Sequence, residues 1–328
     1  MEPRQFCSQS RVLIVAGKGG VGKTIVSAAV AKMAADAGLR CLIVEVEGKS
    51  GLGRLFGRPD SLTYEEVVLA GNGTGRGTVA ARTLTPDDAL MEYLVDHGMR
   101  RISKRLVSTG TLDVVATAVP GIKDILVLGK VKQLERAAAA SAPGSADLLV
   151  VDAPAAGHAV QFLASARGLL DAVGVGPISA QAADVVELLS DPSRCQVMLV
   201  TLPEETPVNE VVETGFRLED QAGVKLAPLV VNGVYPRLEL AGEPAELAAA
   251  SGVALDDEAA RRLGRAAEFR RRRQALQAGQ IARLAQSLPL PQLELPFLFT
   301  TDLGPAEVDT LAAALRSAVE SLEAVPAA

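Results

Sequence analysis

The octapeptide GKGGVGKT at residues 17–24 constrains the fold of this chain more than any other feature. It follows an apolar run at residues 12–16 and precedes a segment with a helical pattern at residues 24–37. Between a strand and a helix, G-x-x-x-x-G-K-[ST] is typical of a loop whose backbone N–H groups wrap a polyphosphate. In this pattern the lysine reaches the outer phosphates and the hydroxyl holds Mg²⁺. The predicted phosphate-binding residues are Gly17, Lys18, Gly19, Gly20, Val21, Gly22, Lys23 and Thr24.

The same loop allows a second interpretation, because three of its glycines also spell the G-x-G-x-x-G of dinucleotide-binding folds. Glu45 and Glu47, at the end of the next apolar run, would then be candidates for binding a ribose. That interpretation leaves both lysines and the threonine of the loop without a role. The phosphate loop uses all of them and is therefore favoured over the dinucleotide-binding alternative.

Apolar runs without alternation recur along the chain, as expected for strands of a parallel sheet that is covered on both faces. Segments with helical patterns separate them, so we predict an α/β fold with a doubly wound, mostly parallel sheet. We expect one domain, residues 1–328, with helical inserts at about 87–136 and 243–286. The predicted strands are residues 12–16, 41–46, 148–151, 197–201 and 229–231, with 79–84 and 293–296 as further candidates.

The charge balance argues against nucleic-acid binding as the main task, because 33 basic and 39 acidic residues give a net charge of −6. The amino terminus has no apolar segment of signal-peptide length, and no run approaches the roughly 18 apolar residues of a spanning helix. We therefore expect a cytoplasmic protein that does not span a membrane. The three cysteines are far apart, without C-x-x-C spacing, and are predicted to be buried bystanders.

Two further acidic positions complete the candidate chemistry. The apolar run at 148–151 ends at Asp152, where phosphate-loop enzymes carry an acid that supports Mg²⁺. The following APAAGH, residues 153–158, is predicted to be a small-residue turn whose glycine approaches the γ-phosphate and relays its loss to the helix beyond. His158 either takes part in this relay or caps that helix. Hydrolysis also requires a group that orients water in line with the γ-phosphate. Glu47 is the candidate, and Glu45 is the alternative.

Together these motifs resemble those of the arsenite-pump and tail-anchored-protein-targeting ATPases, within the deviant phosphate-loop class. The loop is similar at every position, including Lys18, and VVDAPAAGH at 150–158 resembles D-T-A-P-T-G-H. PGIKD at 120–124 is similar to P-G-I-D-E, and VTLPEE at 200–205 to V-x-x-P-E. VVNGVYP at 230–236 looks like the segment whose asparagine contacts adenine, which makes Asn232 the base-reading residue by resemblance. The similarity covers residues 11 to about 300.

The resemblance implies a Mg²⁺-dependent ATPase that binds ATP and dimerises face to face. Lys18 would reach the partner's nucleotide, Thr24 and Asp152 would hold the metal, and Glu47 would orient water. The catalytic set implied is Lys18, Glu47 and Asp152. The partner is a second copy or a paralogous ATPase, since VEVEG at 44–48 resembles actinobacterial anion-transporter ATPases that tend to occur as two paralogues.

The chain departs from the family pattern at positions that affect the expected rate of ATP hydrolysis and the expected cargo. The first switch normally carries Asp-Pro, whereas this chain has Glu47-Gly48, so we expect slow hydrolysis. No cysteine cluster suits arsenite, and the zinc-binding cysteine pair of the targeting ATPases is absent.

An anion-transporter ATPase is the main functional prediction. The alternative is a targeting factor or chaperone for a membrane protein or other hydrophobic client, with a groove built from residues 87–136. Membrane-surface positioning is disfavoured, because residues 309–323 do not form a basic amphipathic segment.

Overall fold

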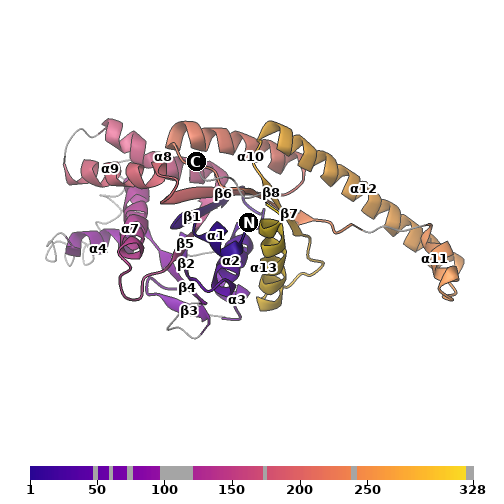
Figure 1. The fold of residues 1–328 in the computed structure, drawn as a ribbon. Coiled ribbons are helices and arrows are strands. Elements are labelled where there is room, and N and C mark those ends of the chain that lie inside the picture. The colour runs from indigo at the N-terminus through magenta and orange to yellow at the C-terminus, as the bar shows by residue number, and fades with distance from the viewer. Residues whose placement is uncertain are drawn as a thin grey trace.

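The middle layer of the protein is an eight-stranded sheet with the order β3-β4-β2-β5-β1-β6-β7-β8 (Figure 1). The computed structural model describes residues 1–46, 51–58, 62–71, 77–96, 121–172, 176–237 and 242–322. The pairing of β3 with β4 is antiparallel, and the other pairings between strands are parallel. The predicted α/β fold is confirmed. The strands are β1 (Val12–Gly17), β2 (Arg40–Val46), β3 (Val67–Ala70), β4 (Thr78–Leu84), β5 (Leu148–Ala155), β6 (Cys195–Thr201), β7 (Leu229–Val234) and β8 (Gln292–Pro296).

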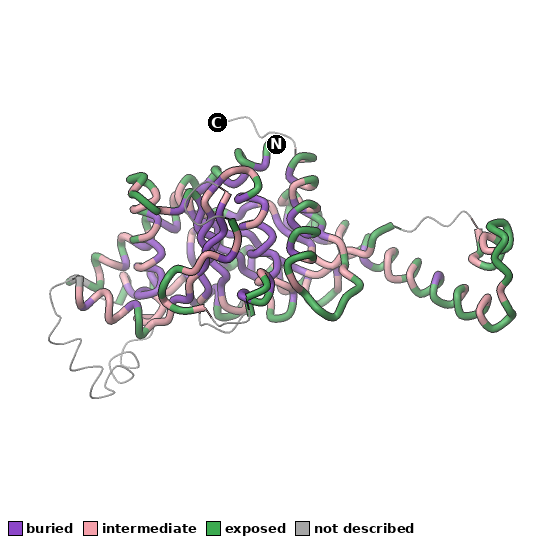
Figure 2. The backbone as a smooth tube through the Cα atoms, turned by 90° about the horizontal axis from the view of Figure 1, so that it is seen from below, coloured by how far each residue is buried: buried purple, intermediate pink, exposed green. Residues whose placement is uncertain are grey.

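Helices cover both faces of this sheet and leave a buried middle layer (Figure 2). One face packs against α1, α2, α3 and α13, and the other packs mainly against α7, α8, α9 and α10. The helices are α1 (Pro3–Cys7), α2 (Lys23–Asp36), α3 (Leu52–Leu55), α4 (Pro86–Asp96), α7 (Ile122–Ala139), α8 (Ala156–Ala172), α9 (Pro177–Ser190), α10 (Glu205–Arg217), α11 (Pro244–Ala250), α12 (Asp257–Ser287) and α13 (Pro305–Glu320), with a π-helical turn at Leu218–Ala222.

Burial on both faces explains why the strands read as unbroken apolar runs. In β5, Leu148 and Val150 face the core beneath α2, while Leu149 and Val151 face the core beneath α8. All four side chains are at most 1% exposed. Because neither face meets water, the strand needs no polar alternation. The structure contains each of the seven predicted strands, and the same reasoning applies to the central ones; β8, at the edge of the sheet, instead alternates between buried and exposed side chains.

The strand order places β1 between β5 and β6, at the point where the winding of the sheet changes direction. The chain leaves β1, passes through α2 and continues into β2 beyond β5, whereas β6, β7 and β8 follow on the other side. Doubly wound sheets bind their ligands at this point, beyond the carboxyl ends of the strands. The loop at residues 17–24 lies in that position.

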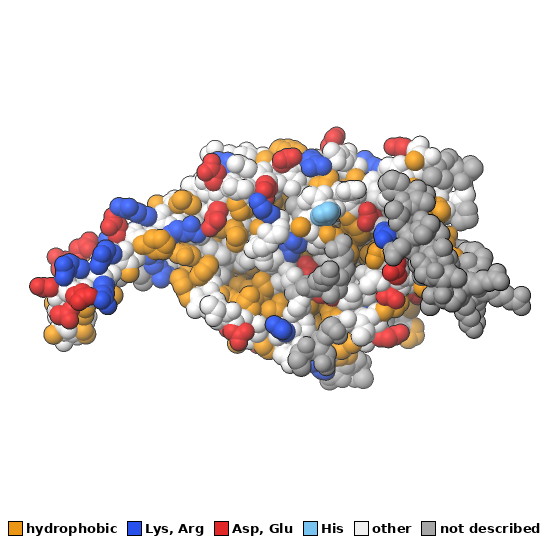
Figure 3. Space-filling view, turned by 180° about the vertical axis from the view of Figure 1, so that it is seen from behind, with side chains coloured by type: hydrophobic (Ala, Val, Ile, Leu, Met, Phe, Trp, Pro, Cys, Tyr) orange, Lys and Arg blue, Asp and Glu red, His pale blue; other side chains and the backbone are white. Residues whose placement is uncertain are grey.

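The second helical insert forms an arm. α12 is 31 residues long and extends away from the sheet, with α11 at its far end (Figure 1). Acidic and basic side chains alternate over the arm (Figure 3), and several pair with each other, as Arg262 does with Glu258 and Arg272 with Glu268. Charge pairs along the helix account for these two arginines, whereas Arg270 and Arg273 donate to residues outside the arm, the backbone oxygen of Pro236 and the carboxylate of Glu204.

The first helical insert is described only in part. Its described residues form α4 and α7, and residues 97–120 lie outside the described part of the chain. Within the described residues, no helix is long and apolar enough to cross a membrane.

Candidate functional site

The glycine loop joins β1 to α2 and lies against neighbouring strands at two points. A Cβ atom at Gly17 would lie 2.4 Å from the backbone oxygen of Val200 on β6, so only glycine permits this approach. Gly22 has φ +91°, and a Cβ there would lie 2.4 Å from Nδ2 of Asn232. The glycines therefore allow the loop to fold back over the carboxyl end of the sheet.

The amino terminus of α2 is directed at this loop. Its cap residue, Gly22, provides no side-chain cap, and the first turn, which lies within the described residues, carries no acidic side chain. The first N–H groups of a helix have no partner inside the helix and carry partial positive charge. An anion is the ligand that such an uncapped end favours, so the loop residues fit a phosphate chain.

Lys23 is the first residue of α2 and curls back over the loop. Its Nζ donates to the backbone oxygen of Lys18 at 3.2 Å. Burial lowers the pKa of Lys23, and the charge of Asp152 opposes that change. The ammonium group is therefore desolvated without full compensation, and a bound phosphate would supply the missing negative charge.

Asp152, Thr24 and Ser27 form a buried cluster beside the loop. Thr24 Oγ1 donates to Asp152 Oδ2 at 2.8 Å, and Ser27 Oγ donates to Oδ1 at 3.4 Å. Burial raises the pKa of Asp152 to about 6, and the charge of Glu45 adds to the rise, while Thr24, Lys23 and Ser27 lower it. A carboxylate and a hydroxyl are hard oxygen donors of the kind that Mg²⁺ accepts together with substrate phosphates. Thr24 and Asp152 thus fit the metal, and their role as its ligands stays a prediction.

Glu45 lies next to Asp152, because the two are register partners on β2 and β5. Its side chain is 4% exposed and accepts a hydrogen bond from Thr83 Oγ1 at 2.6 Å. This environment suits a fixed structural carboxylate near the site. Glu47, the predicted water-orienting residue, falls within residues 47–50, which lie outside the described part of the chain.

Asn232 at the end of β7 contacts the loop from the other side. Its Nδ2 donates to the backbone oxygen of Val21 at 2.9 Å, which fixes the orientation of the amide. The side-chain oxygen is then the acceptor left for a ligand, and it matches the amino group of adenine better than the carbonyl of guanine. The structure therefore brings Asn232 to the loop, and adenine recognition stays a prediction.

Lys18 behaves differently from Lys23. Its Nζ donates to Glu210 Oε1 on α10 at 2.6 Å, and the two side chains are 41% and 38% exposed. The pair borders a pocket of about 270 Å³ between the loop, the start of α8 and α10. The sequence offered no signal for Glu210, because 192 residues separate it from Lys18.

The residues after Asp152 differ from the prediction. Instead of a turn over 153–158, β5 continues to Ala155 and α8 begins at Ala156. Gly157 lies in the first turn of α8, and His158 is exposed. Small residues tolerate strand, turn and helix alike, so composition alone did not distinguish a turn from a direct junction.

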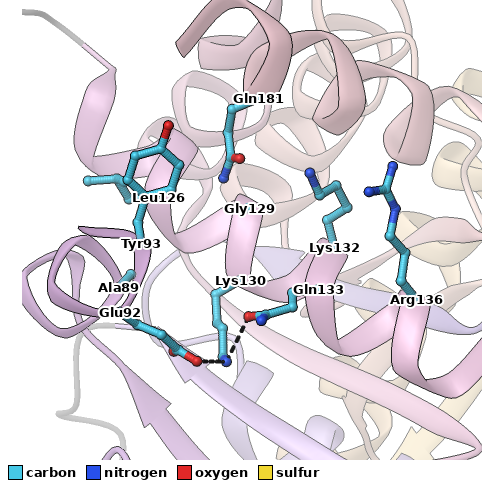
Figure 4. A pocket seen from close by; sticks show the side chains of 10 residues that line it. All are labelled: Ala89, Glu92, Tyr93, Leu126, Gly129, Lys130, Lys132, Gln133, Arg136 and Gln181. Carbon is cyan, nitrogen blue, oxygen red and sulfur yellow. Dashed lines mark hydrogen bonds and ion pairs between the residues drawn. The ribbon is translucent and has the colours of Figure 1, made fainter. Parts of the chain in front are cut away.

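A second pocket, of about 210 Å³, lies between α4, α7 and α9 (Figure 4). Three cations of α7 line it, but Lys130 pairs with Glu92 at 2.5 Å, and Lys132 pairs with Asp184 at 2.7 Å. Arg136 shares Asp184 at 3.3 Å. Figure 4 shows Lys130 and Lys132 directed to different sides of α7, so their charges do not converge on one ligand. This pocket shares no residue with the glycine loop.

Raised pKa at Asp152 leads to a testable effect on stability. The pKa of Asp152 in the folded state, about 6, exceeds the unfolded value of roughly 3.9. Above pH 6 the ionised carboxylate therefore lowers the free energy of unfolding, and this loss disappears as the pH falls to about 4. Asp152→Asn is expected to stabilise the protein without nucleotide and Mg²⁺ by about 1–3 kcal/mol at pH 8. Urea unfolding at pH 8 and pH 4 measures this difference.

The matched control is Asp184→Asn, since Lys132 lowers the pKa of Asp184 and the expected sign is opposite. An Asp152→Asn protein that is less stable than the parent at pH 8 would contradict the prediction.

A phosphate-binding loop between β1 and α2, at the switch point of a doubly wound parallel sheet, defines the class of phosphate-loop nucleoside triphosphatases. Residues 10–174 match the family described as anion-transporting ATPases. The chain is 33% identical over 252 residues to ATPase BagA of Mycobacterium tuberculosis (strain ATCC 25618 / H37Rv), covering 76% of this chain and 72% of that protein.

More distant relatives include a putative arsenical pump-driving ATPase of Halobacterium salinarum, 27% identical over 70% of this chain and 36% of that protein. An arsenical pump-driving ATPase of Escherichia coli is 27% identical over 70% of this chain and 40% of that protein. The chain thus spans about two fifths of the length of these pump-driving relatives. It belongs to the anion-transporting ATPase family, and it is an ATPase. The resemblance is confirmed, and the phosphate-loop interpretation prevails over the dinucleotide-binding one.

Proposed function

We propose that the chain is a Mg²⁺-dependent ATPase in which ATP closes a face-to-face dimer and hydrolysis reopens it. The observation that carries this proposal is the contrast between the two lysines of the loop. Lys23 folds back onto its own loop, whereas Lys18 extends to the surface of α10. Because Lys18 makes its contact outside its own loop, we expect it to reach a nucleotide held by another subunit.

Within one subunit, the backbone of the loop, the start of α2 and Lys23 bind and orient the phosphates. Thr24 and Asp152 hold Mg²⁺, which supplies charge neutralisation at the phosphates when it is bound. Glu47 orients the attacking water, and Asn232 selects adenine. Lys18 adds positive charge to the partner's nucleotide as negative charge develops there.

We further propose that this cycle drives a membrane-embedded anion transporter. The family description and the pump-driving names of two relatives support that choice. The alternative is a targeting factor for hydrophobic clients, and the described walls of the pocket beside α7 do not favour it, since they are lined by paired charges. The partner subunit is a second copy of the chain or a paralogue. Native pull-down with a nonhydrolysable ATP analogue identifies both the partner and the cargo.

Lys18→Ala tests the dimer mechanism directly. We expect nearly unchanged ATP affinity, loss of ATP-dependent self-association, and turnover lowered by about 10- to 100-fold. The effect is smaller than that of an arginine finger because lysine acts as a point charge. Sedimentation with and without a γ-phosphate mimic measures association. Lys32→Ala is the control, because Lys32 pairs with Asp36 on the outer part of α2. Normal hydrolysis by the Lys18 variant would remove the main support for a trans-acting lysine.

A further inference from the structure

The Lys18–Glu210 pair joins the glycine loop to a helix that follows a different strand. Glu210 lies in α10, which comes after β6, and its carboxylate accepts from Lys18 Nζ at 2.6 Å. Within the pocket beside this pair, Arg217 is next to a carboxylate of its own, Glu213, at 3.8 Å. The negative charge of Glu210 is thus directed at Lys18.

α10 is a rigid support for this carboxylate. Val208 and Val211, on either side of Glu210 in the sequence, are 1% and 4% exposed and belong to the core beneath the sheet. A Cβ atom at Gly215 would lie only 3.1 Å from Leu288, so the helix also packs closely at its far end. These contacts fix the backbone of α10 at Glu210, and Lys18 has the longer flexible side chain of the pair.

We propose that Glu210 is a positioning residue that holds Lys18 against its own subunit until the nucleotide of a second subunit displaces it. The inference rests on the proposed dimer mechanism. A triphosphate carries more negative charge than one carboxylate, so Lys18 exchanges Glu210 for phosphate oxygens only when ATP is bound across the interface. Loss of the γ-phosphate weakens that second contact and returns Lys18 to Glu210, which favours reopening.

The test is Glu210→Gln, which keeps the size of the side chain and removes its charge. In nucleotide-free protein, acetylation of Lys18 by an N-hydroxysuccinimide ester, followed by peptide mass spectrometry, is expected to be about twofold to fivefold faster, as for loss of an exposed ion pair. With a nonhydrolysable ATP analogue and Mg²⁺, self-association is expected at about fourfold to 25-fold lower protein concentration, because each dimer breaks two such pairs and their effects multiply. Sedimentation measures this second effect.

Glu213→Gln is the matched control, one helical turn away in the same pocket, and it should change neither measurement. A thermal melt checks that Glu210→Gln folds, and Glu210→Asp, with a shorter reach, should give intermediate values in both measurements.

Unchanged acetylation of Lys18 in Glu210→Gln would overturn the inference and leave the dimer mechanism intact. Faster acetylation with unchanged association would also overturn it, since the pair would then not limit closure. Failure of the parent protein itself to associate with the analogue would instead overturn the proposed function, and the exchange with it.

Discussion

Lys23→Ala is expected to lower the affinity for ATP by about 100-fold, since it removes charge-assisted hydrogen bonds to the outer phosphates and leaves only the backbone of the loop. The structure places Nζ over the loop, 3.2 Å from the backbone oxygen of Lys18, where the phosphate chain is proposed to lie. Calorimetric titration with a nonhydrolysable analogue in the presence of Mg²⁺ measures the affinity. Binding at the strength of the parent protein would contradict the assignment of this loop.

The loss of binding can be separated from loss of folding. Burial lowers the pKa of Lys23, so the nucleotide-free fold disfavours this charge, and removing it should not destabilise the protein. A urea melt of nucleotide-free Lys23→Ala should therefore match the parent protein or show slightly higher stability. Lys32→Ala on the same helix controls for loss of one positive charge, because Lys32 lies away from the loop beside Asp36.

The sequence predicted the central strands well because their burial leaves a simple pattern. Each run that must be apolar on both faces, such as the one that forms β5, stands out without knowledge of its neighbours. β3 was missed for the opposite reason. It lies at the edge of the sheet and is mostly half-buried, and its apolar run, VVLA, is only four residues long, which is too short to distinguish a strand from part of a helix.

Contacts within the candidate site were predictable only where a motif encodes them. Thr24 and Asp152 meet because the loop follows β1 and Asp152 lies on β5, the strand that pairs with β1. Ser27 was missed, although its spacing of three residues from Thr24 places it on the same side of α2. The pair between Lys18 and Glu210 depends on how α10 packs, which no local pattern encodes.

The environment of Glu45 bears on which of the two candidate acids, Glu45 or Glu47, orients water for hydrolysis. Glu45 is buried, accepts from Thr83 and lies beside Asp152, so its environment holds it in place. Glu47 comes two residues later in the sequence and lies outside the described residues, so its role stays a prediction from the sequence. Only Glu47 is therefore expected to reach water in line with the γ-phosphate.

Glu47→Gln should bind Mg²⁺–ATP as tightly as the parent protein and lose turnover by about 10²–10⁴-fold, the range typical of a general acid–base group. Glutamine keeps the size and hydrogen-bonding reach of the side chain but cannot orient or activate water through negative charge. Glu45→Gln is the matched control: its amide oxygen can still accept from Thr83, and the lost charge should lower the pKa of Asp152, with a smaller effect on turnover. Single-turnover hydrolysis at saturating nucleotide measures both. Equal and small effects would mean that replacing the family's aspartate has removed the hydrolytic residue, and that the chain acts as a slow nucleotide-gated switch or as the weaker half of a heterodimer.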